Sequence, residues 1–246
     1  PFLLLWILIT AQCCGYGSGL RLPEAIPGQQ APSHETWDRL LKKHVDAAGL
    51  VDYRGFAQDR DALQEYLDLL AAHIPGDHWS RDEKLAYFIN LYNAGTILLI
   101  LDHSPLESIR DIWNPWGKDF LTIGPSSYSL NDIEHGILRK MDEPRIHFAV
   151  NCASYSCPKL RRDAYRAAAI DAQLDAAATD FINDPERNRL QPGAVEISRI
   201  FKWYKGDFTR PDRDLLEYIN AYFPEPLPRD TDIGYLRYDW KLNEQR

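Results

Sequence analysis

The stretch from Ser80 to Leu101 constrains the fold most strongly, because a clear helix start is followed by a long apolar run. Ser80 and Glu83 have the spacing of a capping box, in which the serine side chain accepts a bond from a backbone N–H and the glutamate bonds back to the cap residue. This box predicts a helix that carries Leu85 to Leu101. Polar side chains within such an apolar helix cost stability unless they are hydrogen-bonded.

Two asparagines interrupt this apolar helix. Asn90 and Asn93 are spaced i, i+3 and therefore share one face, with Tyr92 between them in sequence. Two interpretations follow. The favoured one is that the amides hydrogen-bond a neighbouring loop, and the other is that Asn90, Asn93 and Tyr92 line a binding pocket.

The remaining pattern is also mainly helical. Helices are predicted over 37–45, 63–70, 165–181 and 211–223, and further helix starts at Ser104–Glu107 and Ser129–Asp132. Strands are predicted at 145–150 and 195–197, with a strand or extended tail near 233–240. No internal repeat or second linker is visible, so we predict an α+β fold: a mostly helical single domain with a small β-sheet, over residues 34–246.

Length and charge exclude several classes of protein. A chain of 246 residues, 45% apolar and 26% charged, has the composition of a globular protein with a sizeable core. The net charge of -8 argues against nucleic acid as a partner. Thirteen Tyr and seven Trp suggest a rigid core and a cleft lined by aromatic rings.

The N-terminus is typical of an exported protein. Residues 1–19 hold an apolar stretch too short to span a bilayer, followed by small residues, which predicts a signal peptide whose start is truncated. The residues before Cys13 also resemble a lipidation signal, although Gln12 is large for that site. Residues 20–33 are rich in proline and polar residues and predict a flexible linker. We therefore expect a periplasmic or secreted protein that meets a membrane only through its signal peptide or a lipid anchor.

Cys152 and Cys157 are the two cysteines of the predicted domain, and they permit two interpretations. An exported protein favours a disulfide, which requires a tight turn because bridged Cα atoms lie about 4.4 to 6.8 Å apart. Ser154 and Ser156 allow that turn, and we also count them as candidate binding residues. The alternative is a reactive Cys157 thiol, because Pro158 is suited to the first position of a helix and Lys159 follows.

Polar residues near the cysteines could complete a catalytic site. His135 and His147 are candidate bases for Cys157, and Asn151 is a candidate orienting or oxyanion-binding group. For His147, a role in the apolar core is the favoured alternative. A metal site of Glu134, His135 and His147 lacks diagnostic spacing, so neither a metal nor a cofactor is predicted.

Several long motifs occur together in this order. They are 85–94 (LAYFINLYNA), 132–139 (DIEHGILR), 146–160, 201–204 (FKWY), 207–208 (DF) and 238–243 (YDWKLN). In these motifs the chain resembles the domain of unknown function 547 family over nearly everything after residue 36. The resemblance implies a domain found in exported bacterial proteins, and elsewhere joined to coiled-coil or glutaredoxin-like regions, with no reaction attached to it.

Three hypotheses about function remain open. The first is a hydrolase or acyl transferase with Cys157 as nucleophile and a nearby histidine as base. The second is a non-catalytic binding module of the cell envelope for a small molecule, peptide or glycan, with a structural Cys152–Cys157 disulfide. The third is thiol–disulfide exchange, for which four intervening residues are an unfavourable spacing.

Overall fold

The computed structural model describes residues 20–191 and 194–245. The predicted signal peptide, with Cys13 and Cys14, lies outside the described residues. The observed fold is α+β and mainly helical, with two small sheets, which confirms the predicted fold class.

Helix α4 (Arg81–His103) is the centre of the structure and confirms the predicted capping box. The Ser80 hydroxyl accepts a hydrogen bond from the Glu83 N–H at 3.2 Å, and the Glu83 carboxylate accepts one from the Ser80 N–H at 2.7 Å. By length and composition α4 could cross a membrane, but 89% of its most apolar stretch is buried within the fold. Burial on all sides is what a core helix shows.

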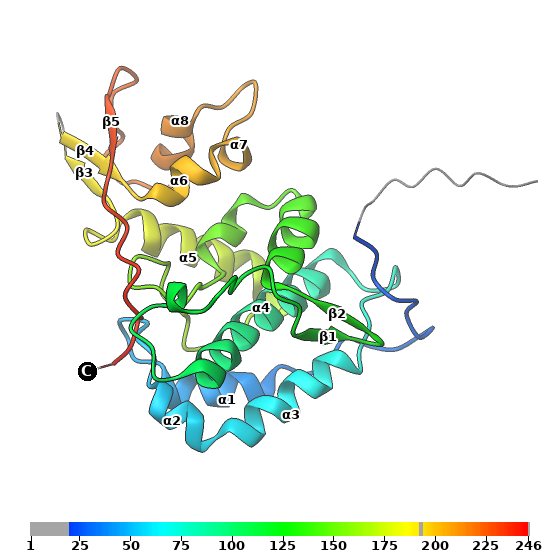
Figure 1. The fold of residues 1–246 in the computed structure, drawn as a ribbon. Coiled ribbons are helices and arrows are strands. Elements are labelled where there is room, and N and C mark those ends of the chain that lie inside the picture. The colour runs from blue at the N-terminus through cyan, green and yellow to red at the C-terminus, as the bar shows by residue number, and fades with distance from the viewer. Residues whose placement is uncertain (1–19, 192–193, 246) are drawn as a thin grey trace, which may run out of the picture.

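Three N-terminal helices and one hairpin contact α4 directly or through one another. They are α1 (Glu35–His44), α2 (Tyr53–Gln58), α3 (Arg60–Ala71) and the hairpin β1 (Leu121–Ile123) with β2 (Ser126–Tyr128). The two strands are antiparallel, with Leu121 opposite Tyr128. Together with α4 these elements enclose the larger hydrophobic core, at the lower end of the molecule in Figure 1.

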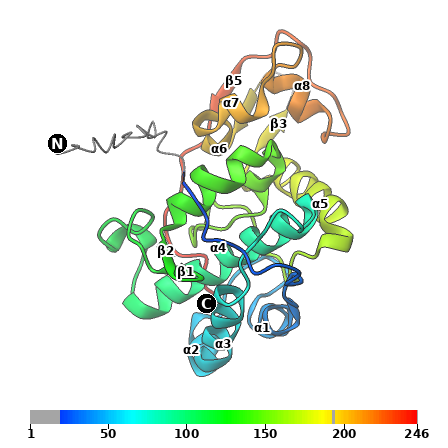
Figure 2. The ribbon, with the colours of Figure 1, turned by 90° about the vertical axis from the view of Figure 1, so that its right-hand side faces the viewer.

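Residues 20–33, predicted as a flexible linker, run across this helical core (Figure 2). Gln29 makes most of the polar contacts: its side-chain amide donates to the Ala72 carbonyl at 2.9 Å, and its own carbonyl accepts from the Trp79 indole at 2.7 Å. Leu22, Ala25 and Ala31 pack against the core as well.

The C-terminal elements surround a second, aromatic core, and most of them lie at the upper end of the molecule in Figure 1. The elements are α5 (Ile170–Ile182), β3 (Arg189–Gln191), β4 (Ala194–Ile197), α6 (Arg199–Trp203), α7 (Lys205–Phe208), α8 (Leu215–Asn220) and β5 (Ile233–Tyr235). Strand β4 pairs antiparallel with β3 and parallel with β5. Strands β4 and β5 confirm the predictions at 195–197 and 233–240.

The C-terminal tail joins the two ends of the molecule. After β5 it runs down the side of the helical core in Figure 1 and makes isolated bridges to Ser154, Ser108 and Val51. Trp240, on this tail, packs against both hydrophobic cores. The tail therefore holds the two cores together.

The predicted strand at 145–150 is wrong, because Pro144–Phe148 form a short 3-10 helix. Glu143 starts this helix by accepting a hydrogen bond from the Arg145 N–H at 3.3 Å. A short apolar run cannot be assigned to strand or helix by periodicity alone. Here His147 and Phe148 are buried because two cores meet around them, not because they lie in a sheet.

Other helix boundaries also differ from the predictions. Ser104 does not start a helix: its hydroxyl donates back to the Ile100 carbonyl at 2.7 Å and so ends α4. The capping box of this region forms at Ser108 and Asp111 instead. The predicted helices over 165–181 and 211–223 are shortened to α5 and α8, and the start at Ser129 leads into a π-helical turn, Asp132–Ile137.

Candidate functional site

A cavity of about 330 Å³ lies where the helical core, the cysteine loop and the C-terminal elements meet. Its size is in the range of small-molecule sites. Its walls come from α4, the π-helical turn, the loop at 150–158, α6 and the C-terminal tail. The lining residues are Tyr92, Trp116, Asn131, Glu134, His135, His147, Val150, Cys152, Cys157, Pro158, Ile200, Trp203, Tyr204, Tyr238 and Trp240.

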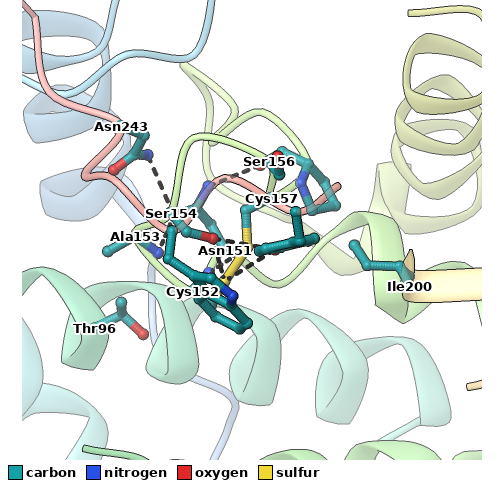
Figure 3. The surroundings of a disulfide bond; sticks show 12 residues. Thr96, Asn151, Cys152, Ala153, Ser154, Ser156, Cys157, Ile200 and Asn243 are labelled. Carbon is teal, nitrogen blue, oxygen red and sulfur yellow. Dashed lines mark hydrogen bonds between the residues drawn. A yellow bond between two sulfur atoms is a disulfide. The ribbon is translucent and has the colours of Figure 1, made fainter. Parts of the chain in front are cut away.

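A disulfide between Cys152 and Cys157 forms part of the wall, which confirms the predicted pairing (Figure 3). The two Cα atoms are 6.2 Å apart. The loop turns tightly because Ala153 adopts a positive φ of 60° and the Cys157 N–H donates to the Ser154 carbonyl at 3.0 Å.

Asn151 fixes this loop from within. Its side-chain oxygen accepts a hydrogen bond from the Ala153 N–H at 2.8 Å, and its amide donates to the Pro158 carbonyl at 2.7 Å. Asn243 of the C-terminal tail donates to the same Asn151 oxygen at 3.3 Å (Figure 3). Asn151 is buried and does not line the cavity, so it positions the loop beside it.

The predicted helix after Pro158 is absent, because residues 158–166 have no regular secondary structure. The helix N-terminus that was expected to activate Cys157 is therefore missing. Two of the basic residues that follow Cys157 are paired: Lys159 lies 3.4 Å from Asp184, and Arg161 lies 3.0 Å from Asp163. Arg187, in contrast, donates to the Cys157 carbonyl at 3.3 Å. The helix argument for a low thiol pKa at Cys157 therefore loses its basis, and the argument from Lys159 is weakened.

His147 forms an ordered pair with Asp207 at the edge of the cavity. Its Nε2 lies 2.7 Å from a carboxylate oxygen of Asp207, and its ring stacks on Tyr204 with centroids 3.9 Å apart. Within the part of the chain that the structure describes, its buried Nδ1 has no hydrogen-bond partner.

Arg139 completes this polar chain by binding Asp207 through two nitrogens, at 2.6 and 2.8 Å. Burial would raise the pKa of Asp207, but the bonds from Arg139 and His147 outweigh it and hold the pKa well below its usual range. His135 lines the cavity and lies 3.3 Å from Arg139 through Nδ1. Among the described residues, neither histidine is hydrogen-bonded to a cysteine sulfur.

Glu134 is the buried acid of the cavity, with an exposed fraction of 6%. Within residues 20–191 and 194–245, no cationic side chain lies within ion-pair distance of its carboxylate. Its neighbours are tyrosines: burial raises the pKa of both Tyr92 and Tyr204, and the adjacent Glu134 carboxylate raises them further. The cavity thus contains a carboxylate faced by phenol groups.

Aromatic rings make up much of the remaining wall. Trp240 lies at the centre of the group, with ring centroids 4.5 Å from Tyr238, 5.7 Å from Trp203 and 5.8 Å from Trp116. Trp203 is 45% exposed, so it stands at the outer side of the group.

The candidate residues from the sequence are only partly brought together. Tyr92, His135, His147, Cys152 and Cys157 share the cavity. The others lie outside it.

The outlying candidates make structural contacts. Asn90 binds both the N–H and the carbonyl of Tyr165, at 3.0 and 2.8 Å, which is the predicted bond to a neighbouring loop. Asn93 likewise binds the segment before the cysteines. The Ser154 hydroxyl contacts Tyr238 at 3.1 Å, and the Ser156 hydroxyl accepts from the Asp239 N–H at 2.9 Å.

Several site residues were not singled out from the sequence. Arg139, Trp203, Tyr204, Asp207 and Trp240 appeared only as parts of long motifs, with no role assigned. The one sequence signal that could have pointed to these residues is that most of them occur in motifs rich in aromatic residues. Nothing in the sequence shows that these distant runs surround one cavity.

The fold and the site define an α+β protein with a helical core and an aromatic cavity that a disulfide closes on one side. Residues 76–182 match the model of a family described as "Protein of unknown function, DUF547", so this segment of the chain is similar to that family. The cysteine loop, Glu134 and His147 lie inside the match, whereas Trp203, Tyr204 and Trp240 lie outside it. No curated protein and no solved structure matches the chain.

Proposed function

We propose that this domain is a binding module whose ligand occupies the aromatic cavity, and that the Cys152–Cys157 disulfide is structural. The observation that carries the proposal is the cavity itself: three tryptophans and three tyrosines surround a few convergent polar groups. A concave, mostly apolar site with a small number of placed polar groups is the usual form of a small-molecule site.

The arrangement of the cysteines supports binding over nucleophilic catalysis. Both sulfurs are used in the disulfide, the helix start at Pro158 is absent, and no histidine is hydrogen-bonded to either sulfur within the described chain. The disulfide instead keeps the 152–157 turn closed against the cavity. Thiol–disulfide exchange is less well supported, because Cys157 is only 4% exposed.

Trp203 offers a direct test of the binding site, because it lines the cavity and, at 45% exposed, is not one of the buried core residues. We expect Trp203→Ala to weaken ligand binding about ten-fold or more, since aromatic residues dominate such contacts. The measurement is saturation-transfer NMR with disaccharides, dipeptides, alkylammonium compounds and carboxylates as probes.

The matched control is Trp113→Ala, which removes a tryptophan that is 85% exposed and outside the cavity. It should leave binding unchanged. If no probe binds at millimolar concentration, or if both variants behave alike, the cavity is not a ligand site.

The proposal also places the domain outside the cytoplasm, where a structural disulfide persists. In acid-quenched cells of the native host, we expect the extracytoplasmic fraction to contain the protein with Cys152 and Cys157 protected from iodoacetamide. Both cysteines should react after reduction and unfolding. Recovery of the protein in the cytoplasm, with Cys157 alkylated before reduction, would refute both the location and the structural role.

A further inference from the structure

Glu134 lines the cavity and has no ion-pair partner among the residues that the structure describes. The described lining residues include no lysine or arginine, and of the two histidines that line the cavity, His147 is bound to Asp207. Glu134 is 6% exposed, so water does little to solvate the carboxylate. Buried charges in proteins are normally paired or bound to a ligand of opposite charge.

Arg139, the cation on the same segment, interacts with Glu134 only through space, because its guanidinium is bound to another carboxylate. Arg139 binds Asp207 through two nitrogens and lies over the ring of Tyr204, with its guanidinium carbon 5.3 Å from the ring centroid. Arg139 does not line the cavity. Glu134 therefore lines the cavity beside the phenols of Tyr92 and Tyr204, without a cation of the described chain bound to it.

We propose that the ligand of this cavity is an organic cation with an alkylated ammonium group, held by Glu134 and by the aromatic walls. The inference rests on the proposed binding function and names its ligand class. Aromatic faces attract cations through the ring quadrupole, and sets of such faces recognise quaternary ammonium ligands. Glu134 supplies the opposite charge at the inner side.

The aromatic walls favour a fully alkylated ammonium group over a primary one. A primary ammonium carries three N–H donors, each of which needs an acceptor when buried. Apart from Glu134, the polar lining groups are Asn131, His135, His147 and the tyrosine hydroxyls, and indole and phenol faces, Val150, Ile200, Pro158 and the disulfide make up the rest. A quaternary ammonium has no N–H donor and loses nothing in such surroundings. A neutral sugar could stack on the rings but would leave the carboxylate uncompensated.

Choline and 3,3-dimethylbutan-1-ol form the decisive probe pair, because they have the same shape and differ in charge. With the disulfide-intact protein at pH 7.5, isothermal titration calorimetry is expected to show choline binding about ten-fold or more tightly than the neutral alcohol. Tetramethylammonium should bind as well. These results are expected only if the charge is recognised.

Glu134→Gln keeps the shape of the side chain and removes its charge. We expect it to weaken choline binding about ten-fold or more and to leave the affinity for the neutral alcohol unchanged. Glu225→Gln removes an exposed carboxylate that does not line the cavity and should change neither affinity. Trp203→Leu keeps apolar bulk without a ring, and should weaken choline more than the alcohol. Trp203→Leu therefore tests whether the aromatic wall binds the cation, even if Glu134→Gln does not fold.

The outcomes separate the two proposals. If sugars, dipeptides or carboxylates bind in a Trp203-dependent way while choline and tetramethylammonium do not, the cation proposal is wrong and the binding function stands. If Glu134→Gln weakens both members of the probe pair equally, Glu134 acts on the cavity shape and not as a counter-ion. If no probe of any class binds, both proposals are wrong.

Discussion

Replacing Asn93 by alanine is expected to lower the free energy of unfolding by about 4 kcal/mol, because two buried backbone groups lose their partners. The Asn93 amide donates to the Ala149 carbonyl at 2.9 Å, and its oxygen accepts from the Asn151 N–H at 2.8 Å. Asn93 is 2% exposed, so water cannot replace these bonds. The variant should also loosen the cysteine loop that starts at Asn151.

The measurement is urea denaturation with the disulfide intact, and the control is Asn131→Ala. Asn131 is exposed, and its side chain caps no helix N–H. This control should change stability by less than about 0.5 kcal/mol, as is usual at such surface positions. A loss below about 1 kcal/mol in Asn93→Ala would show that the α4 amide does not hold the loop.

The titration of His34 is expected to lower the free energy of unfolding by about 3 kcal/mol as the pH drops from 6.5 to 4. Burial, with a smaller contribution from Arg166, lowers the pKa of His34 to about 4. Its Nδ1 lies 2.8 Å from the Tyr66 hydroxyl in the core. Unfolded His34 takes up a proton below about pH 6.5 and folded His34 only near pH 4, so acidification through this window favours the unfolded state.

His34→Gln removes the titrating group and should flatten the pH dependence of stability between pH 6.5 and 4.5. Glutamine can still hydrogen-bond Tyr66, which separates the loss of titration from the loss of the contact. Denaturation midpoints for both proteins across this range provide the comparison. A ring-proton NMR titration of His34 with a midpoint near 6.5 would disprove the explanation.

The sequence by itself determined the elements whose signals are local. The capping box at Ser80 predicted α4, and the expectation of an exported protein favoured a disulfide between Cys152 and Cys157, whose spacing required a tight turn. The two asparagines were predicted to bind a neighbouring loop because an unpaired amide in an apolar helix is costly. Each of these conclusions depends on interactions within a few residues or on the cost of burying one group.

Only the tertiary structure decided the composition of the site. His147 was expected in a strand, but it lies in a 3-10 helix where it meets Asp207, 60 residues away. Trp240 reaches the cavity because the C-terminal tail returns along the helical core. Whether Glu134 is paired depends on which cations surround it in space. Burial and long-range contacts have no local sequence pattern, so the aromatic cavity and its unpaired carboxylate could not be predicted from the sequence.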